Sequence, residues 1–292
     1  MKSKSAMKTK YNIMHFIVGC FFVVLWNCTD SSLDSDNTIS KNTIRGQVEL
    51  SDHLSPEDVH VWFKVFGIST RTDENGAFEL TLPPAAQQGG GGSDGIFNLY
   101  FYMANYQLDS VEVVLFNGSI QASNRVKRDG ELVEIVQLAK LLDIKNSFSE
   151  DQEGSITIIF TVEAKIGVVN ISADFSNPES QGDPQYIVGF VRKIDPDQDF
   201  CLGIYRENRT HRTGDFQIEN HPTELFPLEI INKSGMFTPG EYEVIPSLVI
   251  HQEIPSGLLE SLGNTADACH KFFNVPLRIN NNRFQVSPGS GK

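Results

Sequence analysis

The chain has 292 residues, 40% of them hydrophobic, and a net charge of −13 at pH 7. That hydrophobic content is ample for a packed core, which excludes a disordered chain. An acidic surface repels phosphate backbones, so we expect no nucleic-acid partner.

Residues 1–27 have the layout of a secretory signal peptide. Four lysines precede an apolar run at 13–26, which is too short to span a bilayer as a helix. Cys28 lies two residues beyond the run, and Leu25 lies three before the cysteine. This arrangement resembles a bacterial lipobox, which implies cleavage before Cys28 and acyl chains on it. Trp26 and Asn27 are bulkier than the usual small residues, so an ordinary signal peptide with an incidental cysteine stays open.

Residues 28–42 predict a disordered tether, because they are polar, include three aspartates and have little to bury. Loss of the four leader lysines takes the net charge to −17. We expect a lipid-anchored protein of a Gram-negative outer membrane. The acidic, serine-rich start resembles the surface-export signals of Bacteroidota lipoproteins. Periplasmic and cell-surface orientations both stay open.

The 265 residues from Cys28 onward suggest two domains, 43–146 and 155–286, separated by a polar stretch at 146–154. Cys201 and Cys269 are an even pair in an exported chain, which favours a disulfide. Two buried free thiols are the alternative.

Period-two alternation predicts an antiparallel β-sandwich over the first domain. Its expected strands are residues 43–50, 59–65, 78–82, 97–103 and 111–115. Residues 132–138 suit either a strand or a helix, and we favour a strand. A glycine-rich loop at 90–95 reads G-x-G-x-x-G, but a strand follows it instead of a helix, so we expect no nucleotide cofactor there.

Residues 44–48, 59–61 and 70–83, with the turn Thr72-Asp73-Glu74-Asn75-Gly76, resemble the carboxypeptidase regulatory-like domain. The resemblance covers residues 43–140, a third of the chain, and Tyr106 also lies where the family has a tyrosine. It implies a transthyretin-like (prealbumin-like) sandwich and an accessory module without catalytic residues. Such modules often precede outer-membrane receptors.

Tyr100 and Tyr102 are candidate ligand-binding residues. Alternation puts them on the face opposite Phe97 and Phe101, so one set is available for stacking on a ligand. Packing in the core or between domains is the alternative.

The second domain also predicts mostly strands, which makes the whole chain all-β. Its expected strands are residues 156–162, 169–175, 186–193, 200–205, 225–231, 242–250 and 273–279. Residues 258–262 and 266–271 predict short helices. A second β-sandwich is the simplest architecture.

Candidate chemical groups in the second domain are few. Asp195, Asp197 and Asp199 alternate in a loop, where three carboxylates can converge on Ca²⁺. The loop lacks the glycine and the distal glutamate of a calcium loop, so solvated acid is the alternative. The histidines lack zinc-ligand spacing, and we expect no G-x-S-x-G nucleophile elbow.

We therefore expect a non-enzymatic envelope protein, without a cofactor, that binds a protein or glycan or has a structural role. Two alternatives stay open. One is an accessory lipoprotein of an outer-membrane uptake receptor. The other is a glycan- or peptide-processing enzyme with its site in the second domain.

Overall fold

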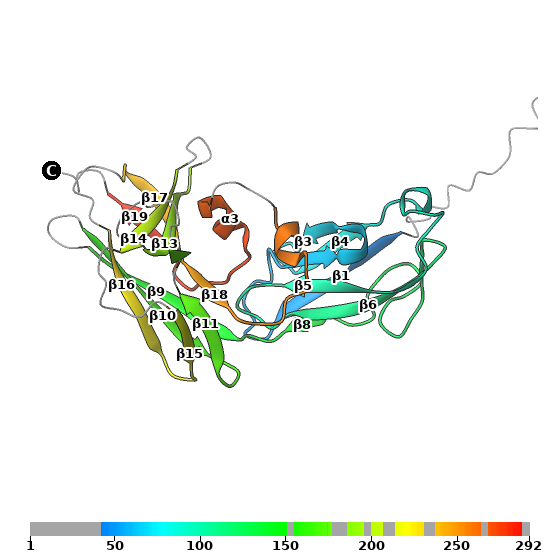
Figure 1. Cartoon of the computed structure of the whole chain (residues 1–292), viewed down its shortest axis with the longest axis horizontal. Coiled ribbons are helices and arrows are strands. Elements are labelled where there is room, and N and C mark those ends of the chain that lie inside the picture. Colours follow the sequence, from blue (N-terminus) through cyan, green and yellow to red (C-terminus); the bar gives the residue numbers. More distant parts are fainter. Residues whose placement is uncertain are drawn as a thin grey trace, which may run out of the picture. The chain divides into compact units, whose positions relative to one another are not determined.

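The computed structural model describes residues 42–150, 155–173, 175–176, 186–195, 200–206, 214–230, 237–263 and 268–287. Residues 42–292 group into one compact unit. The described part is built from strands with a few short helices, which confirms the all-β expectation (Figure 1). The signal sequence, the tether and Cys28 lie outside the described residues.

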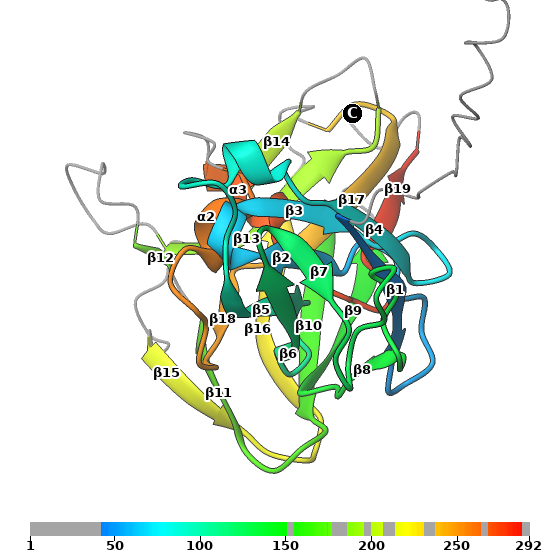
Figure 2. The same ribbon diagram turned by 90° about the vertical axis from the view of Figure 1, so that its right-hand side faces the viewer.

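The first sandwich consists of two sheets. The smaller has the order β4 (Ala77–Thr81), β1 (Thr43–Leu50), β8 (Val136–Leu138). The larger has the order β3 (Ile68–Arg71), β2 (His60–Phe63), β5 (Gly95–Tyr102), β6 (Asp109–Phe116), β7 (Ser119–Gln121). Two 3₁₀ turns, η1 (Lys64–Phe66) and η2 (Ala85–Gln87), lie in its connections. Figure 2 shows β1, β4 and β8 on one side of this sandwich and β2, β5, β6 and β7 together.

Alternation in the sequence sets which side chains enter the core. Ile44, Val48 and Leu50 of β1 are buried, whereas Gln47 between them is exposed. The inward residues of both sheets join one hydrophobic cluster that runs from Ile44 to Leu138. Each strand thus buries one face, as a half-buried strand should.

The turn between β3 and β4 is fixed by local hydrogen bonds. The Asp73 carboxylate accepts the backbone N–H groups of Asn75 and Ala77, each at 2.9 Å. Gly76 has φ of 80°, and a Cβ there would lie 2.1 Å from the carbonyl oxygen of Val48. Only glycine fits this position, because the turn needs positive φ and close approach of β1.

The strand expected over 132–138 forms only at its end, as β8. Glu131 bridges Arg45, and Val136 pairs with Val48. Between these two pairs, two residues of β1 are matched by four on the other side, so residues 132–135 bulge out of the sheet. The side chain of Leu132 turns back over Gly46, where it occupies the space that a Cβ would need.

Three sheets surround the second core. The first is β16 (Thr223–Ile230), β10 (Ile156–Ala164), β9 (Leu142–Glu150), and the second is β15 (Gly214–Ile218), β11 (Val169–Ala173), β18 (Leu248–Ile250). The third is β12 (Phe175–Ser176), β13 (Tyr186–Lys193), β17 (Gly240–Pro246), β19 (Arg283–Val286), with β14 (Cys201–Arg206) on β13. Their inward residues form a separate hydrophobic cluster from Leu142 to Val286.

The polar stretch that we expected to divide the domains lies differently. Residues 142–150 form β9, which pairs along its whole length with β10. Leu142 and Ile144 belong to the second core. The change from one core to the other thus falls between Leu138 and Leu142. Ser147, Ser149 and Glu150 are exposed whereas Asn146 is buried, so this polar stretch is the end of a strand and not a linker. The domain division itself stays a prediction.

The strand expected at 273–279 is wrong. Helix α3 (Ala268–Asn274) occupies its start, after the short helix α2 (Leu258–Ser261). Beyond α3 the chain runs along the first sandwich, where Ala104 N donates to Pro276 O at 2.7 Å. The apolar residues of this segment cover other elements instead of alternating across a sheet.

The C-terminal segment also packs on the outer face of β2 and β5. Leu258 joins Trp62 and Tyr102 in a buried cluster. Gln252 accepts a hydrogen bond from the N–H of Leu108 at 2.9 Å and donates to the carbonyl of Ala104 at 3.2 Å. These contacts leave that face of the larger sheet covered.

No helix within the described ranges is long and apolar enough to cross a membrane. The apolar run at 13–26 is not among those residues.

Candidate functional site

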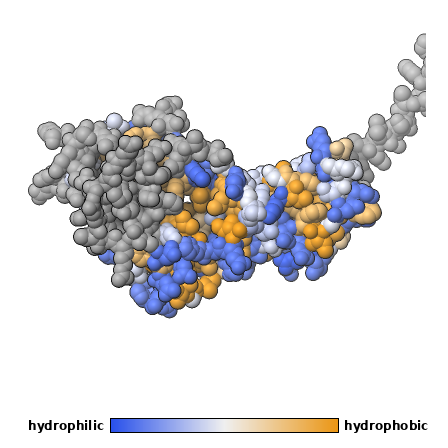
Figure 3. Space-filling view, in the orientation of Figure 1, coloured by the Kyte–Doolittle hydropathy of each residue, from blue (hydrophilic) through white to orange (hydrophobic). Residues whose placement is uncertain are grey.

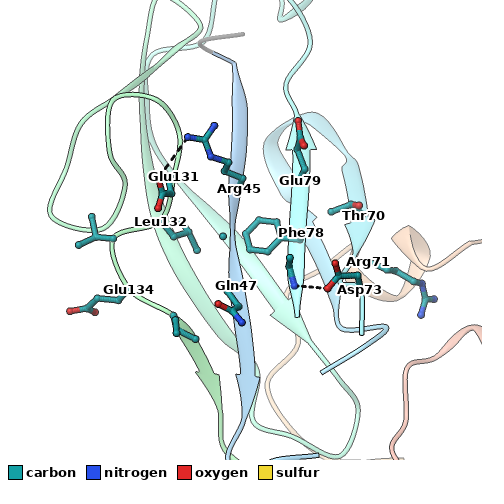
Figure 4. A pocket seen from close by; sticks show the side chains of 14 residues that line it. Arg45, Gln47, Thr70, Arg71, Asp73, Phe78, Glu79, Glu131, Leu132 and Glu134 are labelled. Atoms are coloured by element: carbon teal, nitrogen blue, oxygen red, sulfur yellow. Dashed lines mark hydrogen bonds and ion pairs between the residues drawn. The ribbon is translucent and has the colours of Figure 1, made fainter. Parts of the chain in front are cut away.

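A groove of about 760 Å³ lies on the smaller sheet of the first sandwich. Its floor is the outward face of β1 and β4, which carries Arg45, Gln47 and Glu79 (Figure 4). The bulge at 132–135 forms one wall. Thr70 and Asp73, at the end of β3 and in the turn that follows, form the other. The two extra residues opposite β1 therefore create the groove.

Ion pairs hold the wall beside the bulge. Arg45 Nη2 lies 2.6 Å from the carboxylate of Asp129 and 3.7 Å from that of Glu131. Lys127 also pairs with Glu131, at 3.0 Å. The N–H of Glu131 and the nearby Arg45 lower the pKa of Asp129, so that carboxylate stays ionised. All these groups are partly exposed, so they orient the wall more than they stabilise the fold.

Apolar surface lies next to these charges. Val133 and Ile135 in the bulge are each 47% exposed. Phe78, also at the groove, is only 5% exposed and stacks edge-on with Phe101 inside the core. The groove therefore offers aliphatic contacts from its wall, while its aromatic ring belongs to the core.

One edge of the groove has free backbone groups. β4 is the end strand of its sheet. Val48 N donates to Gly76 O and Leu82 N donates to Asn42 O, so residues 76, 78, 80 and 82 direct their backbone groups to β1. Glu79 lies between them and directs its N–H and C=O away from β1. Such an edge can pair with another extended chain.

The predicted ligand-binding tyrosines lie elsewhere, on the covered face of β5. Tyr102 is 4% exposed and packs against Trp62 and Leu258. Burial raises the pKa of Tyr102 to about 12. Tyr100 lies at the margin of this cluster, half-buried, with its ring 5.8 Å from that of Trp62. Tyr102 is therefore packed against other elements of the chain, which was the alternative to ligand stacking.

Of the three aspartates in the predicted acidic loop, only the first, Asp195, lies within the described residues. Asp195 Oδ2 lies 3.7 Å from Lys193 Nζ. Asp197 and Asp199 fall outside the described residues. Within the described ranges, no three His, Cys, Asp or Glu side chains come close enough to hold a metal ion.

The predicted disulfide is present. Cys201 of β14 and Cys269 of α3 are bonded, with their Cα atoms 6.0 Å apart. Phe272 of the same helix stacks on Phe190 of β13, with ring centroids 4.6 Å apart. The bond and the stack together hold α3 on the sheet of β13 and β14.

A buried charge network joins the two cores, and nothing in the sequence pattern predicted it. Lys140 Nζ lies 2.8 Å from both Asp52 and Asp143. Tyr106 donates its hydroxyl to Asp52 at 2.9 Å, and Asn280 donates to Asp143 at 3.1 Å. Lys140 and Asp143 side chains are each only 8% exposed. Every charge in the network has a partner, which indicates a structural role.

The pKa values of this network follow from its geometry. Burial alone would raise the pKa of Asp52 and of Asp143, but hydrogen bonds and the charge of Lys140 outweigh it, so both are lowered. Burial likewise opposes the charge of Lys140, yet the two carboxylates raise its pKa. Burial and Asp52 raise the pKa of Tyr106. All four groups keep their ordinary charge at neutral pH.

The structure also brings together a serine, a histidine and an aspartate that the sequence did not connect. On the sheet of β11, β15 and β18, Ser172 Oγ lies 2.6 Å from His251 Nε2 and donates to Asp215 at 2.6 Å. A hydroxyl has one proton, so His251 then donates to Ser172 instead of accepting from it. That is the reverse of the arrangement that activates a nucleophile.

No family model and no curated protein sequence matches the chain. Solved structures with some similarity include a candidate carbohydrate-binding protein from Bacteroides uniformis, at 10% identity and a TM-score of 0.33. That match covers 72% of this chain and 90% of the other. Two DUF3823 family proteins are also similar. The one from Bacteroides ovatus has 14% identity, coverage of 73% and 96%, and a TM-score of 0.27. The one from Parabacteroides merdae has 11% identity, coverage of 72% and 95%, and a TM-score of 0.31. Scores this low carry no argument about function.

Proposed function

We propose that the chain is a lipid-anchored protein of the bacterial cell envelope whose role is non-catalytic binding of a partner protein. Acylated Cys28 is the anchor, in the outer membrane. The sandwiches work in the aqueous space on its periplasmic or outer side. The observation that carries the binding role is the open groove between β4 and the bulge at 132–135.

Two features support export and attachment. The lipobox-like arrangement at residues 25–28 supplies the acylation site. The bond between Cys201 and Cys269 fits an oxidising compartment, because disulfides rarely persist in the reducing cytosol.

Three features of the groove favour an extended protein segment over a glycan. Val133 and Ile135 offer aliphatic contact, and charged side chains of both signs lie around them. The free N–H and C=O of Glu79 can extend the sheet by one strand. Apolar and charged surface lie interleaved over the visible face of the first sandwich (Figure 3). A partner strand with alternating apolar and polar residues matches this pattern.

Substituting both Val133 and Ile135 with aspartate should weaken the partner complex by about tenfold or more, because two half-exposed apolar contacts are replaced by charge. A photo-crosslinker at position 135 of the full, membrane-bound chain identifies the partner. Its affinity for the purified chain is then measured with and without the two substitutions. Val168→Asp is the matched control, since Val168 is 56% exposed on the second sandwich.

The control should bind as the unchanged chain does. A crosslinking pattern that is identical at positions 135 and 168 would contradict the groove as the binding site. In the same strains, Cys28→Ser should release the chain from the membrane fraction. If it stayed in that fraction with an unchanged mass, the anchor would be disproved while the groove could still stand.

We also propose that residues 43–140 are a carboxypeptidase regulatory-like module. The turn at Asp73–Gly76, the strands on either side of it and the buried Tyr106 support this. Such a module would suit an accessory lipoprotein of an uptake receptor. Crosslinking of position 135 to an outer-membrane receptor would favour that role.

A second candidate function, acyl hydrolysis at Ser172, is favoured only by its short contact with His251. Because the serine proton goes to Asp215, we expect Ser172 to be unreactive. Incubation with a fluorophosphonate probe should give no more label on the unchanged chain than on Ser172→Ala. Labelling that Ser172→Ala or His251→Ala abolishes would establish the enzyme instead.

A further inference from the structure

We infer that a second site, which shares only Arg71 with the groove, binds a compact oxyanion such as a carboxylate or a phosphate group. It is a cavity of about 340 Å³ beside the segment that follows α3, in the orange to red part of the chain in Figure 1. Four arginines line it, in a chain whose net charge is strongly negative: Arg71, Arg192, Arg278 and Arg283.

Two of these arginines have carboxylate partners. Arg192 donates from Nε to Glu243 at 2.7 Å, and its guanidinium lies 4.3 Å from the centre of the Phe273 ring. Arg283 lies 3.7 Å from Glu241, and its side chain is 57% exposed. Their charge is therefore largely balanced within the chain.

The other two are held by neutral groups. Arg71 Nη2 donates to the carbonyl oxygen of Asn274 at 2.7 Å, and Arg278 Nη2 donates to that of Glu57. The nearest carboxylate to Arg71 is Asp58, at 4.0 Å and 62% exposed. Carbonyl groups orient a guanidinium without neutralising it, so Arg278 keeps its charge with no ion pair among the described residues, whereas Arg71 is paired with the exposed Asp58. Arg71 lines both the groove and this cavity, and in Figure 4 its side chain extends away from β4.

Arg278 also has an unsatisfied donor. Its Nε is buried and has no hydrogen-bond partner among the described residues. A buried donor without a partner costs about 1–3 kcal/mol, and more when it is charged. Because this Nε is closed to solvent, an oxyanion in the cavity would accept from the Nη groups of Arg278 and from the guanidinium of Arg71.

The backbone around Arg278 is fixed before any ligand arrives. The backbone N–H of Arg278 donates to the Asn105 side chain at 3.0 Å, and the carbonyl oxygen of Arg278 accepts from the same side chain at 2.8 Å. Asn280 N donates to Ile144 O at 2.9 Å. Preorganised donors bind more tightly because little ordering remains to be done on binding. The size of the cavity suits a small anionic group instead of a long chain.

Isothermal titration of the purified full chain with inorganic phosphate, and separately with malonate, tests the inference. We expect saturable binding of at least one anion. Tighter binding of phosphate identifies a phosphorylated ligand, and tighter binding of malonate identifies a carboxylate. Arg278→Gln should weaken the binding at least tenfold, because a charge-assisted hydrogen bond is lost. The anion affinity of Arg278→Lys should fall between those of the unchanged chain and Arg278→Gln, since lysine keeps the charge but lacks the planar guanidinium with its paired N–H donors.

Arg125→Gln is the matched control, because Arg125 is an exposed arginine paired with Glu134 on the first sandwich. It should bind as the unchanged chain does. If Arg278→Gln does not fold, Arg71→Gln replaces it, since that side chain is 36% exposed. No saturable binding of either anion would overturn the inference. So would equal affinity in the Arg71, Arg278 and Arg125 variants.

Discussion

Replacing Lys140 with methionine should lower the free energy of unfolding by about 3–5 kcal/mol, because it removes the cation shared by two buried carboxylates. Asp52 and Asp143 would stay buried without the ammonium that lies 2.8 Å from each. Urea denaturation at pH 7 measures the change. Lys127→Met is the matched control, since Lys127 is 52% exposed and pairs only with Glu131. The control should stay within about 0.5 kcal/mol of the unchanged chain.

The unchanged chain and the Lys140→Met chain should differ in how their stability responds to acid. In the unchanged chain the pKa values of Asp52 and Asp143 are lowered from 3.8 in the folded state. Their contribution is therefore complete above pH 4 and is lost as pH falls through the folded values. Without Lys140, burial should raise both pKa values instead. Acidification from pH 7 towards pH 4 should then stabilise the Lys140→Met chain.

Two results would contradict this account. One is a loss of less than about 1 kcal/mol in the free energy of unfolding for Lys140→Met, which would mean that water reaches the carboxylates. The other is a parallel fall in stability for both chains on acidification. Lys145 also lies 3.1 Å from Asp143 but is 57% exposed, so it should replace only part of the lost charge.

Removing the disulfide by Cys201→Ala and Cys269→Ala together should lower the free energy of unfolding by about 4 kcal/mol. The bond closes a loop of 68 residues, and the chain-entropy model gives about that value for this length. Alanine is the suitable replacement, because Cys269 is 5% exposed and serine would bury a hydroxyl there. Denaturant midpoints of the double variant, and of the unchanged chain fully reduced, should agree.

Removal of the disulfide should also have a local effect on helix α3. The stack of Phe272 on Phe190 remains in the double variant, so α3 should stay docked but open more often. Amide hydrogen exchange over residues 268–274 should therefore accelerate, while β5 and β6 of the first sandwich should be unaffected. Unchanged exchange in α3 would mean that the stack, and not the bond, holds the helix.

Strands that bury one face were predictable from the sequence. The alternation of Ile44, Val48 and Leu50 with polar residues gave β1 its bounds, and β13 agrees with its expected range as well. The disulfide was predictable by counting cysteines in a chain that the sequence predicts to be exported. In each case the prediction needs only the residues of one strand, or one pair of cysteines, and no knowledge of the rest of the fold.

The missed features depend on partners far away in the chain. β15 and β19 are short, and they pair with β11 and β17, which lie far from them in the sequence. The apolar residues at 273–279 pack on different elements, Val275 beside Trp62 and both Leu277 and Ile279 on the second core, so no local period marks them. Lys140 meets Asp52 across 88 positions of sequence, and the groove depends on two extra residues opposite β1. Only the folded chain brings these groups together.

The central position of β1 has a mechanical consequence. β1 is bonded antiparallel to β4 on one edge and parallel to β8 on the other, and it starts at Thr43, right after the segment that we assign to the tether. With the proposed anchor at Cys28, a pull from the membrane would enter the fold at this strand. It would load the β4 ladder at Thr43–Gln47 first and reach the β8 ladder at Val48–Leu50 through it.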